Sequence, residues 1–163
     1  MSKLYTGHRE VIATEEAIDK LYNLGKVEPP DRRYTIYPNQ FVTLKNGSQS
    51  AITRMKSDGL LHLVKTKIKA SGIAPRNREQ IMAMDLLLDD DVPVVFLTGR
   101  AGSGKTILCT ACAIQKIQDE KYQKMILTRP MSQVGRRELG ILRVELKKNS
   151  IHTLKTISII LNR

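Results

Sequence analysis

The pattern of apolar and polar positions in the first part of the chain predicts one helix followed by short strands. Apolar residues recur at helical spacing over Glu15–Leu24, Thr14 can cap this helix, and Gly25 can end it. Runs typical of strands then cover residues 33–37, 40–45, 50–55 and 60–65, and the pairs Asn46-Gly47 and Asp58-Gly59 predict turns between them. Residues 1–72 are therefore expected to form a small N-terminal helix with an antiparallel β appendage.

A different pattern begins at residue 73, where apolar strands alternate with amphipathic stretches. The expected order is helix, strand, helix, strand, over residues 77–88, 92–98, 104–118 and 124–128. Alternation of a buried strand with a crossover helix is typical of an α/β fold with a parallel sheet. Residues 73–142 therefore predict such a core, and two strands leave its sheet incomplete.

Residues 143–163 show no clear period and contain five basic residues and one acidic residue. The apolar run at 157–161 is close to the end of the sequence, where we expect no isolated strand. We expect this segment to be a divergent tail outside the core.

Composition restricts the class of protein. A hydrophobic fraction of 41% over 163 residues is typical of one globular domain, with or without an appendage, and excludes wholesale disorder, collagen and coiled coil. No apolar run can span a bilayer, no signal-peptide pattern opens the sequence, and two cysteines suit a reducing, cytoplasmic setting. The net charge of +11 favours polyanions such as nucleic acid, nucleotide or anionic lipid, although a basic surface also keeps proteins soluble.

The strongest chemical signal is a Walker A motif, G-x-x-x-x-G-K-[ST], between the expected strand and helix. It consists of Gly99, Arg100, Ala101, Gly102, Ser103, Gly104, Lys105 and Thr106. Its glycines let backbone N–H groups approach phosphates closely, and the helix N-terminus adds partial positive charge. Lys105 can reach the β- and γ-phosphates, and the Thr106 hydroxyl can ligate Mg²⁺. The core is therefore expected to be of the P-loop NTPase type.

Three further residues are candidates for nucleotide contacts. Gln80 can present both a donor and an acceptor to an adenine edge, and Asn77 opens the same helix. Arg129 follows the last strand of the core, and ligands of open α/β sheets bind at the carboxyl ends of the strands. The alternatives are a solvated helix residue for Gln80 and a surface arginine beside Pro130 for Arg129.

Other side chains give weaker signals. Cys109 and Cys112 are spaced C-x-x-C within a helix, and we expect small core residues rather than metal ligands or a redox pair. The three histidines have no cluster of carboxylates or cysteines near them in the sequence, which argues against a metal centre or a catalytic triad. Four tyrosines could stack on bases, although packing is the favoured alternative; they are Tyr5, Tyr22, Tyr34 and Tyr37.

The segments flanking the Walker A motif carry a resemblance to a known family. They are Pro75–Gln80, Asp85–Asp89, Thr128–Pro130, Gly135 and Gly140–Leu142. Together with the motif they resemble the PhoH-like P-loop ATPases, and Tyr37–Leu44 resembles the branch in which the ATPase follows a PIN-type ribonuclease domain. The resemblance covers about residues 1–142. It implies binding and hydrolysis of ATP with Mg²⁺ and an RNA-related role.

The sequence departs from that family after Leu142. The family has a downstream strand ending in Asp-Glu, whose carboxylates position Mg²⁺ and the attacking water. Beyond Thr128 this sequence offers only Glu138 and Glu145 as acids, so we assign no catalytic residue. A frameshift or premature stop would explain this, because the back-translated tail, shifted by one nucleotide, can spell the Pro-Gly and Glu-Glu-Lys that the family shows here. A naturally divergent tail is the alternative.

Three functions stay open from the sequence. The first is an ATP-binding, truncated PhoH-like protein with impaired hydrolysis. The second is a competent ATPase whose missing carboxylate comes from another chain in an oligomer. The third is an RNA-binding module that uses the basic β appendage, with nucleotide binding secondary. In each case we expect a cytoplasmic protein that does not associate with membranes.

Overall fold

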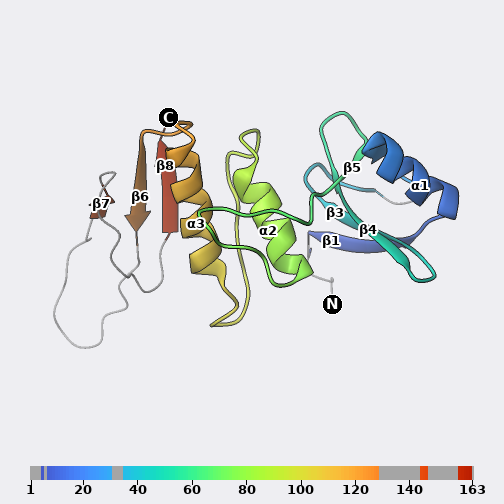
Figure 1. The fold of residues 1–163 in the computed structure, drawn as a ribbon, viewed down its shortest axis with the longest axis horizontal. Helices are drawn as coiled ribbons and strands as arrows, with labels where there is room; N and C mark the ends of the chain where they lie inside the picture. Colours follow the sequence, from blue (N-terminus) through green and yellow to red (C-terminus); the bar gives the residue numbers. More distant parts are fainter. Residues whose placement is uncertain (1–4, 6, 31–34, 129–143, 147–157, 163) are drawn as a thin grey trace. The chain divides into compact units, whose positions relative to one another are not determined.

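The computed structural model describes residues 5, 7–30, 35–128, 144–146 and 158–162 (Figure 1). The chain divides into two compact units, Met1–Thr66 and Lys67–Arg163. The first unit holds a five-stranded sheet and the second a three-stranded sheet. Helices accompany both sheets, so the α/β class predicted from the sequence is confirmed. Among the described residues, no helix is long and apolar enough to cross a membrane.

The helix of the first unit, α1 (Glu15–Leu24), begins and ends where the sequence predicts. The Thr14 hydroxyl accepts a hydrogen bond from the backbone N–H of Ala17 at 3.3 Å, which caps the first turn. Gly25 has a left-handed φ of 72°, and its N–H donates to the carbonyl of Leu21 at 2.8 Å. A residue without Cβ adopts this conformation at little cost, so Gly25 ends the helix.

The sheet of the first unit contains one parallel pair. Its strands, in the order β1-β3-β4-β5-β2, are β1 (His8–Ile12), β3 (Phe41–Asn46), β4 (Gln49–Met55), β5 (Leu61–Leu63) and β2 (Lys26–Val27). β1 runs parallel to β3 because the chain returns through α1, and all other pairs are antiparallel. The prediction of a wholly antiparallel appendage is therefore wrong, because β1 is parallel to its neighbour. Strands β1 and β2 were not predicted from the sequence. Residues 35–37, predicted as strand, are not strand, and 33–34 lie outside the described residues.

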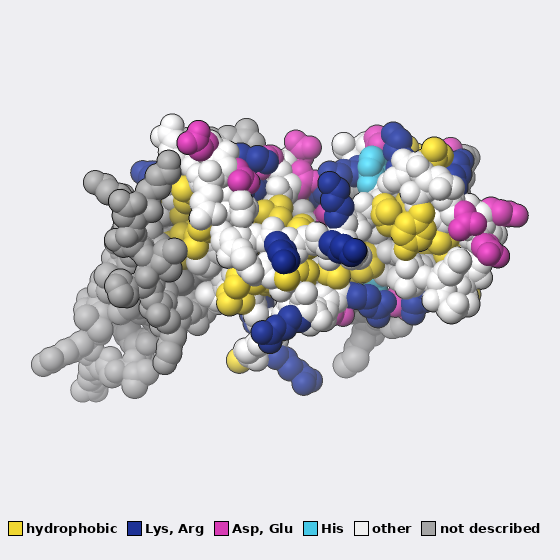
Figure 2. Space-filling model, viewed as in Figure 1, with side chains coloured by type: hydrophobic (Ala, Val, Ile, Leu, Met, Phe, Trp, Pro, Cys, Tyr) yellow, Lys and Arg dark blue, Asp and Glu magenta, His cyan; other side chains and the backbone are white. Residues whose placement is uncertain are grey.

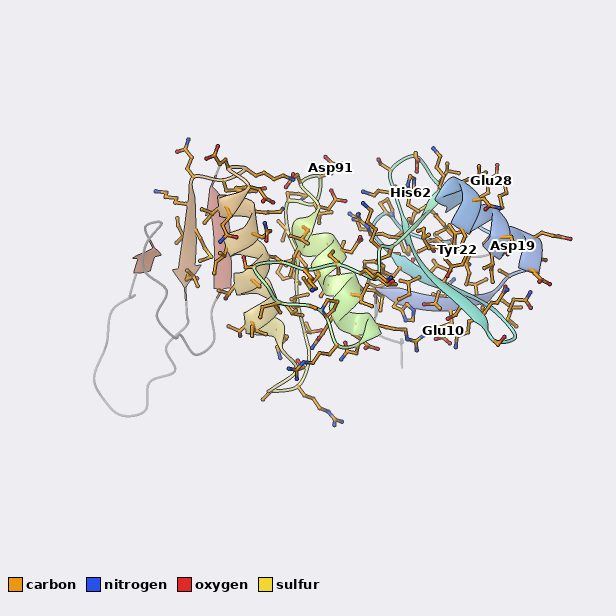
Figure 3. The ribbon with its side chains drawn as sticks, in the orientation of Figure 1. Glu10, Asp19, Tyr22, Glu28, His62 and Asp91 are labelled. Carbon is orange, nitrogen blue, oxygen red and sulfur yellow. The ribbon has the colours of Figure 1, made fainter. Side chains whose placement is uncertain are left out.

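One face of this sheet packs against α1 and forms the core of the first unit. The buried residues are Val11, Ala13, Ile18, Leu21, Val27, Val42, Leu44, Ala51, Met55 and Leu61. At the surface, Lys45 of β3 pairs with Glu10 of β1 at 2.7 Å, and the Tyr22 hydroxyl of α1 donates to the carbonyl of Ser50 at 3.3 Å (Figure 3 labels Glu10 and Tyr22).

The second unit places a long helix between a shorter helix and a strand. α3 (Lys105–Gln118) packs on α2 (Arg78–Leu88) through a core that includes Met84, Leu108 and Cys112 (Figure 1). A second cluster joins α3 to β6 (Lys124–Thr128), through Ala113 of the helix and Met125 and Leu127 of the strand. Helices α2 and α3 and strand β6 lie within one residue of their predicted bounds.

The pairing of β6 overturns two expectations. β7 (Val144–Leu146) and β8 (Ser158–Asn162) pair antiparallel with β6, one on each side. The apolar run near the end of the sequence therefore forms a strand, contrary to expectation, because it has β6 as a partner. Residues 92–98 form no strand, and Val94 and Phe96 are 63% and 87% exposed. Both edges of β6 are occupied, so the predicted parallel pairing with this segment does not occur.

The C-terminal half of α3 is fixed by a buried lysine. The Lys116 ammonium lies 3.1 Å from the Asp90 carboxylate and donates to the carbonyl of Asp89 at 3.3 Å. It also lies over the ring of Tyr122, 5.3 Å from the centroid. Lys121 binds the second carboxylate oxygen of Asp90. These contacts fix the turn after α2 to α3. The chain continues from this turn toward the Walker A motif.

We expect Leu21→Ala to lower the free energy of unfolding of the first unit by about 2–5 kcal/mol, because Leu21 is fully buried beneath the sheet. Leu24→Ala removes the same atoms from the same helix at a position that is 63% exposed, and it should have a small effect. Urea denaturation followed by circular dichroism would measure both. Equal losses in the two variants would contradict the packing of α1.

We expect Asp90→Asn to lower the melting temperature near neutral pH and to make little difference in acid. The hydrogen bond from Lys121, followed by that from Lys116, lowers the pKa of Asp90 below 3.8. A lowered pKa stabilises the fold above the unfolded pKa, and this contribution is lost as pH falls through the folded value. The two melting temperatures should therefore begin to approach each other as the pH falls below about 4, the pKa of an unfolded aspartate. Asp91→Asn, at the exposed neighbouring position labelled in Figure 3, is the control.

Candidate functional site

The Walker A residues form a turn that leads directly into α3. Gly99, Gly102 and Gly104 have φ values of 154°, 79° and 86°, a region that other residues rarely adopt. The N–H of Ser103 donates to the carbonyl of Arg100 at 3.3 Å and closes the turn. Gly104 is the N-cap of α3 and makes no side-chain cap, so its first N–H groups keep the partial positive charge of a helix N-terminus.

The ammonium group of Lys105 lies inside this turn. It donates hydrogen bonds to the carbonyls of Gly99 and Arg100 at 2.8 and 2.7 Å and to the hydroxyl of Ser103 at 3.2 Å. All three acceptors belong to the motif itself, and none is a carboxylate. Thr106 follows as the second residue of α3 and is half-buried. The loop therefore holds one positive charge at a helix N-terminus, an arrangement that suits a phosphate group.

Gln80, a candidate for nucleotide contacts from the sequence, lies against the same loop, and its contact with the backbone of the loop was not predicted. Its amide nitrogen donates to the carbonyl of Ser103 at 3.2 Å, and its amide oxygen accepts from the backbone N–H of Arg76 at 2.8 Å. Asn77 caps α2, since its side-chain oxygen accepts from the N–H of Gln80 at 2.9 Å. A contact from a side chain to a distant backbone carbonyl has no signature in a single sequence, so only the structure reveals it.

The other predicted contacts divide in two groups. Arg100 and Ala101 belong to the motif and are exposed at the tip of the loop. Arg129 lies outside the described residues, as does Glu138, and the side chain of Glu145 is not described. The structure therefore brings together the motif, Gln80 and Asn77, and leaves the place of Arg129 a prediction.

The two cysteines of α3 are free thiols in a helix that is packed on both sides. Cys112 belongs to the core between α2 and α3, and burial raises the pKa of its thiol to about 12. Burial also raises the pKa of Cys109, so both thiols stay protonated near neutral pH. Across the described ranges, no group of three or more His, Cys, Asp or Glu could hold a metal ion. The predicted core position is therefore observed for Cys112, whereas Cys109 is only partly buried.

Three of the four tyrosines that could stack on bases are described, and all lie in the first unit. Tyr5 and Tyr37 meet edge to face, with ring centroids 6.0 Å apart, and Tyr22 is bonded to Ser50. Each is more than half exposed, so none belongs to the hydrophobic core of that unit. Tyr34 lies outside the described residues.

Known proteins are similar to this sequence over most of its length. Protein PhoH2 of Bacillus subtilis is 33% identical over 147 residues, which cover 86% of this chain and 33% of the relative. Protein PhoH2 of Mycolicibacterium smegmatis is 31% identical over 139 residues, covering 85% of this chain and 32% of that protein. A PhoH-like protein of Mycobacterium leprae is 29% identical over 133 residues, or 82% of this chain and 36% of the relative. No solved structure matches.

The chain spans about a third of the length of these curated relatives. Residues 72–163 match the family described as PhoH-like protein, and this match includes the Walker A loop, α3 and the strands that flank β6. More than half of the chain is covered by that match. The protein therefore belongs to the PhoH-like family, as the motif and its flanking segments suggested.

Proposed function

We propose that this chain binds ATP, together with Mg²⁺, through the loop of residues 99–106. The observation that carries the proposal is the Lys105 ammonium, which the loop surrounds at the N-terminus of α3. Three backbone positions with positive φ let the loop close around a small anion without Cβ atoms in the way. Membership of the PhoH-like family supports the same ligand class.

In the proposed complex the phosphates replace the internal partners of Lys105. Its ammonium would leave the carbonyls of Gly99 and Arg100 for the β- and γ-phosphates, because a charged acceptor makes the stronger hydrogen bond. The N–H groups at the start of α3 would complete the phosphate contacts. Thr106 is the residue of the loop whose hydroxyl would ligate Mg²⁺. A bound Mg²⁺ neutralises phosphate charge. Gln80 and Asn77 lie beside the loop on α2, and Arg129 is proposed as a further contact.

Hydrolysis needs more than this loop supplies. In this family, carboxylates orient the attacking water and make a second contact with the metal. After Thr128 the sequence offers only Glu138 and Glu145 as acids, and neither follows an apolar strand. We therefore propose a nucleotide-binding protein with impaired hydrolysis. A carboxylate from another chain would instead produce a competent ATPase, whose turnover per chain would rise with protein concentration.

An RNA-related role is the second proposed function, and the net charge of +11 supports it. Lys and Arg side chains are spread over the face drawn in Figure 2, among acidic ones. Binding through phosphate contacts weakens steeply with salt. Retention of a single-stranded RNA that falls with salt and is unaffected by Lys105→Ala would support an RNA site apart from the loop.

We expect Lys105→Ala to weaken Mg-ATP binding by about tenfold or more, because a hydrogen bond to a charged group contributes about 1.5–3 kcal/mol. Isothermal titration calorimetry would measure the affinity. Lys124→Ala removes an exposed lysine at the start of β6 and is the matched control. Equal affinities in the wild type and the Lys105 variant would refute the proposed phosphate site.

We expect the purified 163-residue chain to turn over ATP at a rate far below about 1 s⁻¹ while still binding it. The reason is that the strand ending in Asp-Glu, whose carboxylates position Mg²⁺ and the attacking water in the family, has no counterpart between Thr128 and Arg163. A phosphate-release assay over a range of protein concentrations would measure this. Turnover at ordinary rates that disappears in Lys105→Ala would show a competent ATPase.

A further inference from the structure

The side chain of Gln80 connects two chain segments that are far apart in the sequence. Its amide oxygen accepts from the N–H of Arg76, ahead of α2, at 2.8 Å. Its amide nitrogen donates to the carbonyl of Ser103, in the phosphate loop, at 3.2 Å. The N–H of Gln80 is itself bonded to the side chain of Asn77, the N-cap of α2. The N–H of Arg76 therefore fixes the side-chain amide of Gln80, and this amide in turn fixes one carbonyl of the loop, that of Ser103.

The contact falls where the loop turns into α3. A Cβ built on Gly104 would lie 2.9 Å from the amide nitrogen of Gln80. Gly104 also has a left-handed φ of 86°. The carbonyl that Gln80 holds belongs to the peptide group whose nitrogen is that of Gly104. Fixing this carbonyl restricts the orientation of the peptide that precedes the left-handed residue.

We propose that Gln80 is a positioning residue for the phosphate loop, which orients the Ser103–Gly104 peptide whether or not a base is bound. The proposal rests on the proposed phosphate-binding function of the loop. With the peptide fixed, Gly104 keeps its left-handed conformation, and the N-terminus of α3 and Lys105 keep their direction into the loop. The loop is then ordered when the chain folds, so the entropy cost of ordering it does not reduce the affinity for the ligand.

This role predicts that the effect of Gln80 is independent of the base. A residue that reads adenine affects ATP and leaves a ligand without a base unchanged. A residue that orients the loop affects both ligands by the same factor. Inorganic triphosphate, which carries the phosphates without ribose or base, separates the two roles.

The experiment measures binding of Mg-ATP and of magnesium triphosphate to the full chain by calorimetry. Gln80→Ala should weaken both ligands by roughly fivefold or more and by equal factors, because the hydrogen bond to the loop is lost together with the one that fixes the amide. Gln80→Glu is a second variant: it can still accept from Arg76 but cannot donate to Ser103, and it should weaken both ligands too. Amide hydrogen exchange of the loop peptide should become faster in both variants.

The matched control is Gln115→Ala. Gln115 also bridges by its amide, accepting from the N–H of Ser71 at 2.8 Å and donating to Asp119 at 2.8 Å, but it lies in the C-terminal half of α3. It should lower the melting temperature and leave both affinities unchanged.

Two outcomes would overturn the proposal. Loss of ATP binding alone in Gln80→Ala would assign base reading instead, and unchanged binding of both ligands would remove Gln80 from the site. Both results leave the phosphate site intact, provided that Lys105→Ala loses both ligands. If the wild-type chain binds neither ligand, the proposed function fails, and the positioning role with it.

Discussion

The burial of α3 is the constraint on which the second unit depends. This helix packs against α2 on one side and β6 on the other, and Lys116 ties it to the turn after α2. A phosphate loop is an irregular segment whose conformation comes from what fixes its ends. Because α3 is held at three places, its first residue is held too. The direction of Lys105 into the loop follows from that packing.

The positive charge of Lys105 has hydrogen-bond partners within the loop itself. Lys105 donates to two carbonyls and a hydroxyl of the motif, so a phosphate bound as proposed would replace these partners. In the proposed complex, the net gain on binding would be the difference between charged and neutral acceptors, not the full value of the new hydrogen bonds. The proposed role of Gln80 would reduce the ordering of the loop that this binding requires.

The three-stranded sheet differs from the parallel arrangement expected for this class of fold. β6 pairs antiparallel with strands on both sides, and residues 92–98 lead into the loop without pairing. An apolar segment with alternating exposed side chains, such as Val94 and Phe96, retains the pattern of a strand. The segment shows that a suitable pattern does not by itself make a strand, which also needs a pairing partner.

Local sequence determined where the helices of this protein begin and end, and where its glycine-rich loop lies. The caps Thr14 and Asn77, the stop at Gly25 and the Walker A glycines act through contacts within a few residues, so their signals are readable in one sequence. The tertiary structure alone decided the strand partners and the contact of Gln80 with the loop. Those interactions join residues distant along the chain, and both edges of β6 are occupied by β7 and β8, strands from near the end of the sequence. No local pattern encodes such pairings, because each depends on a partner elsewhere in the chain.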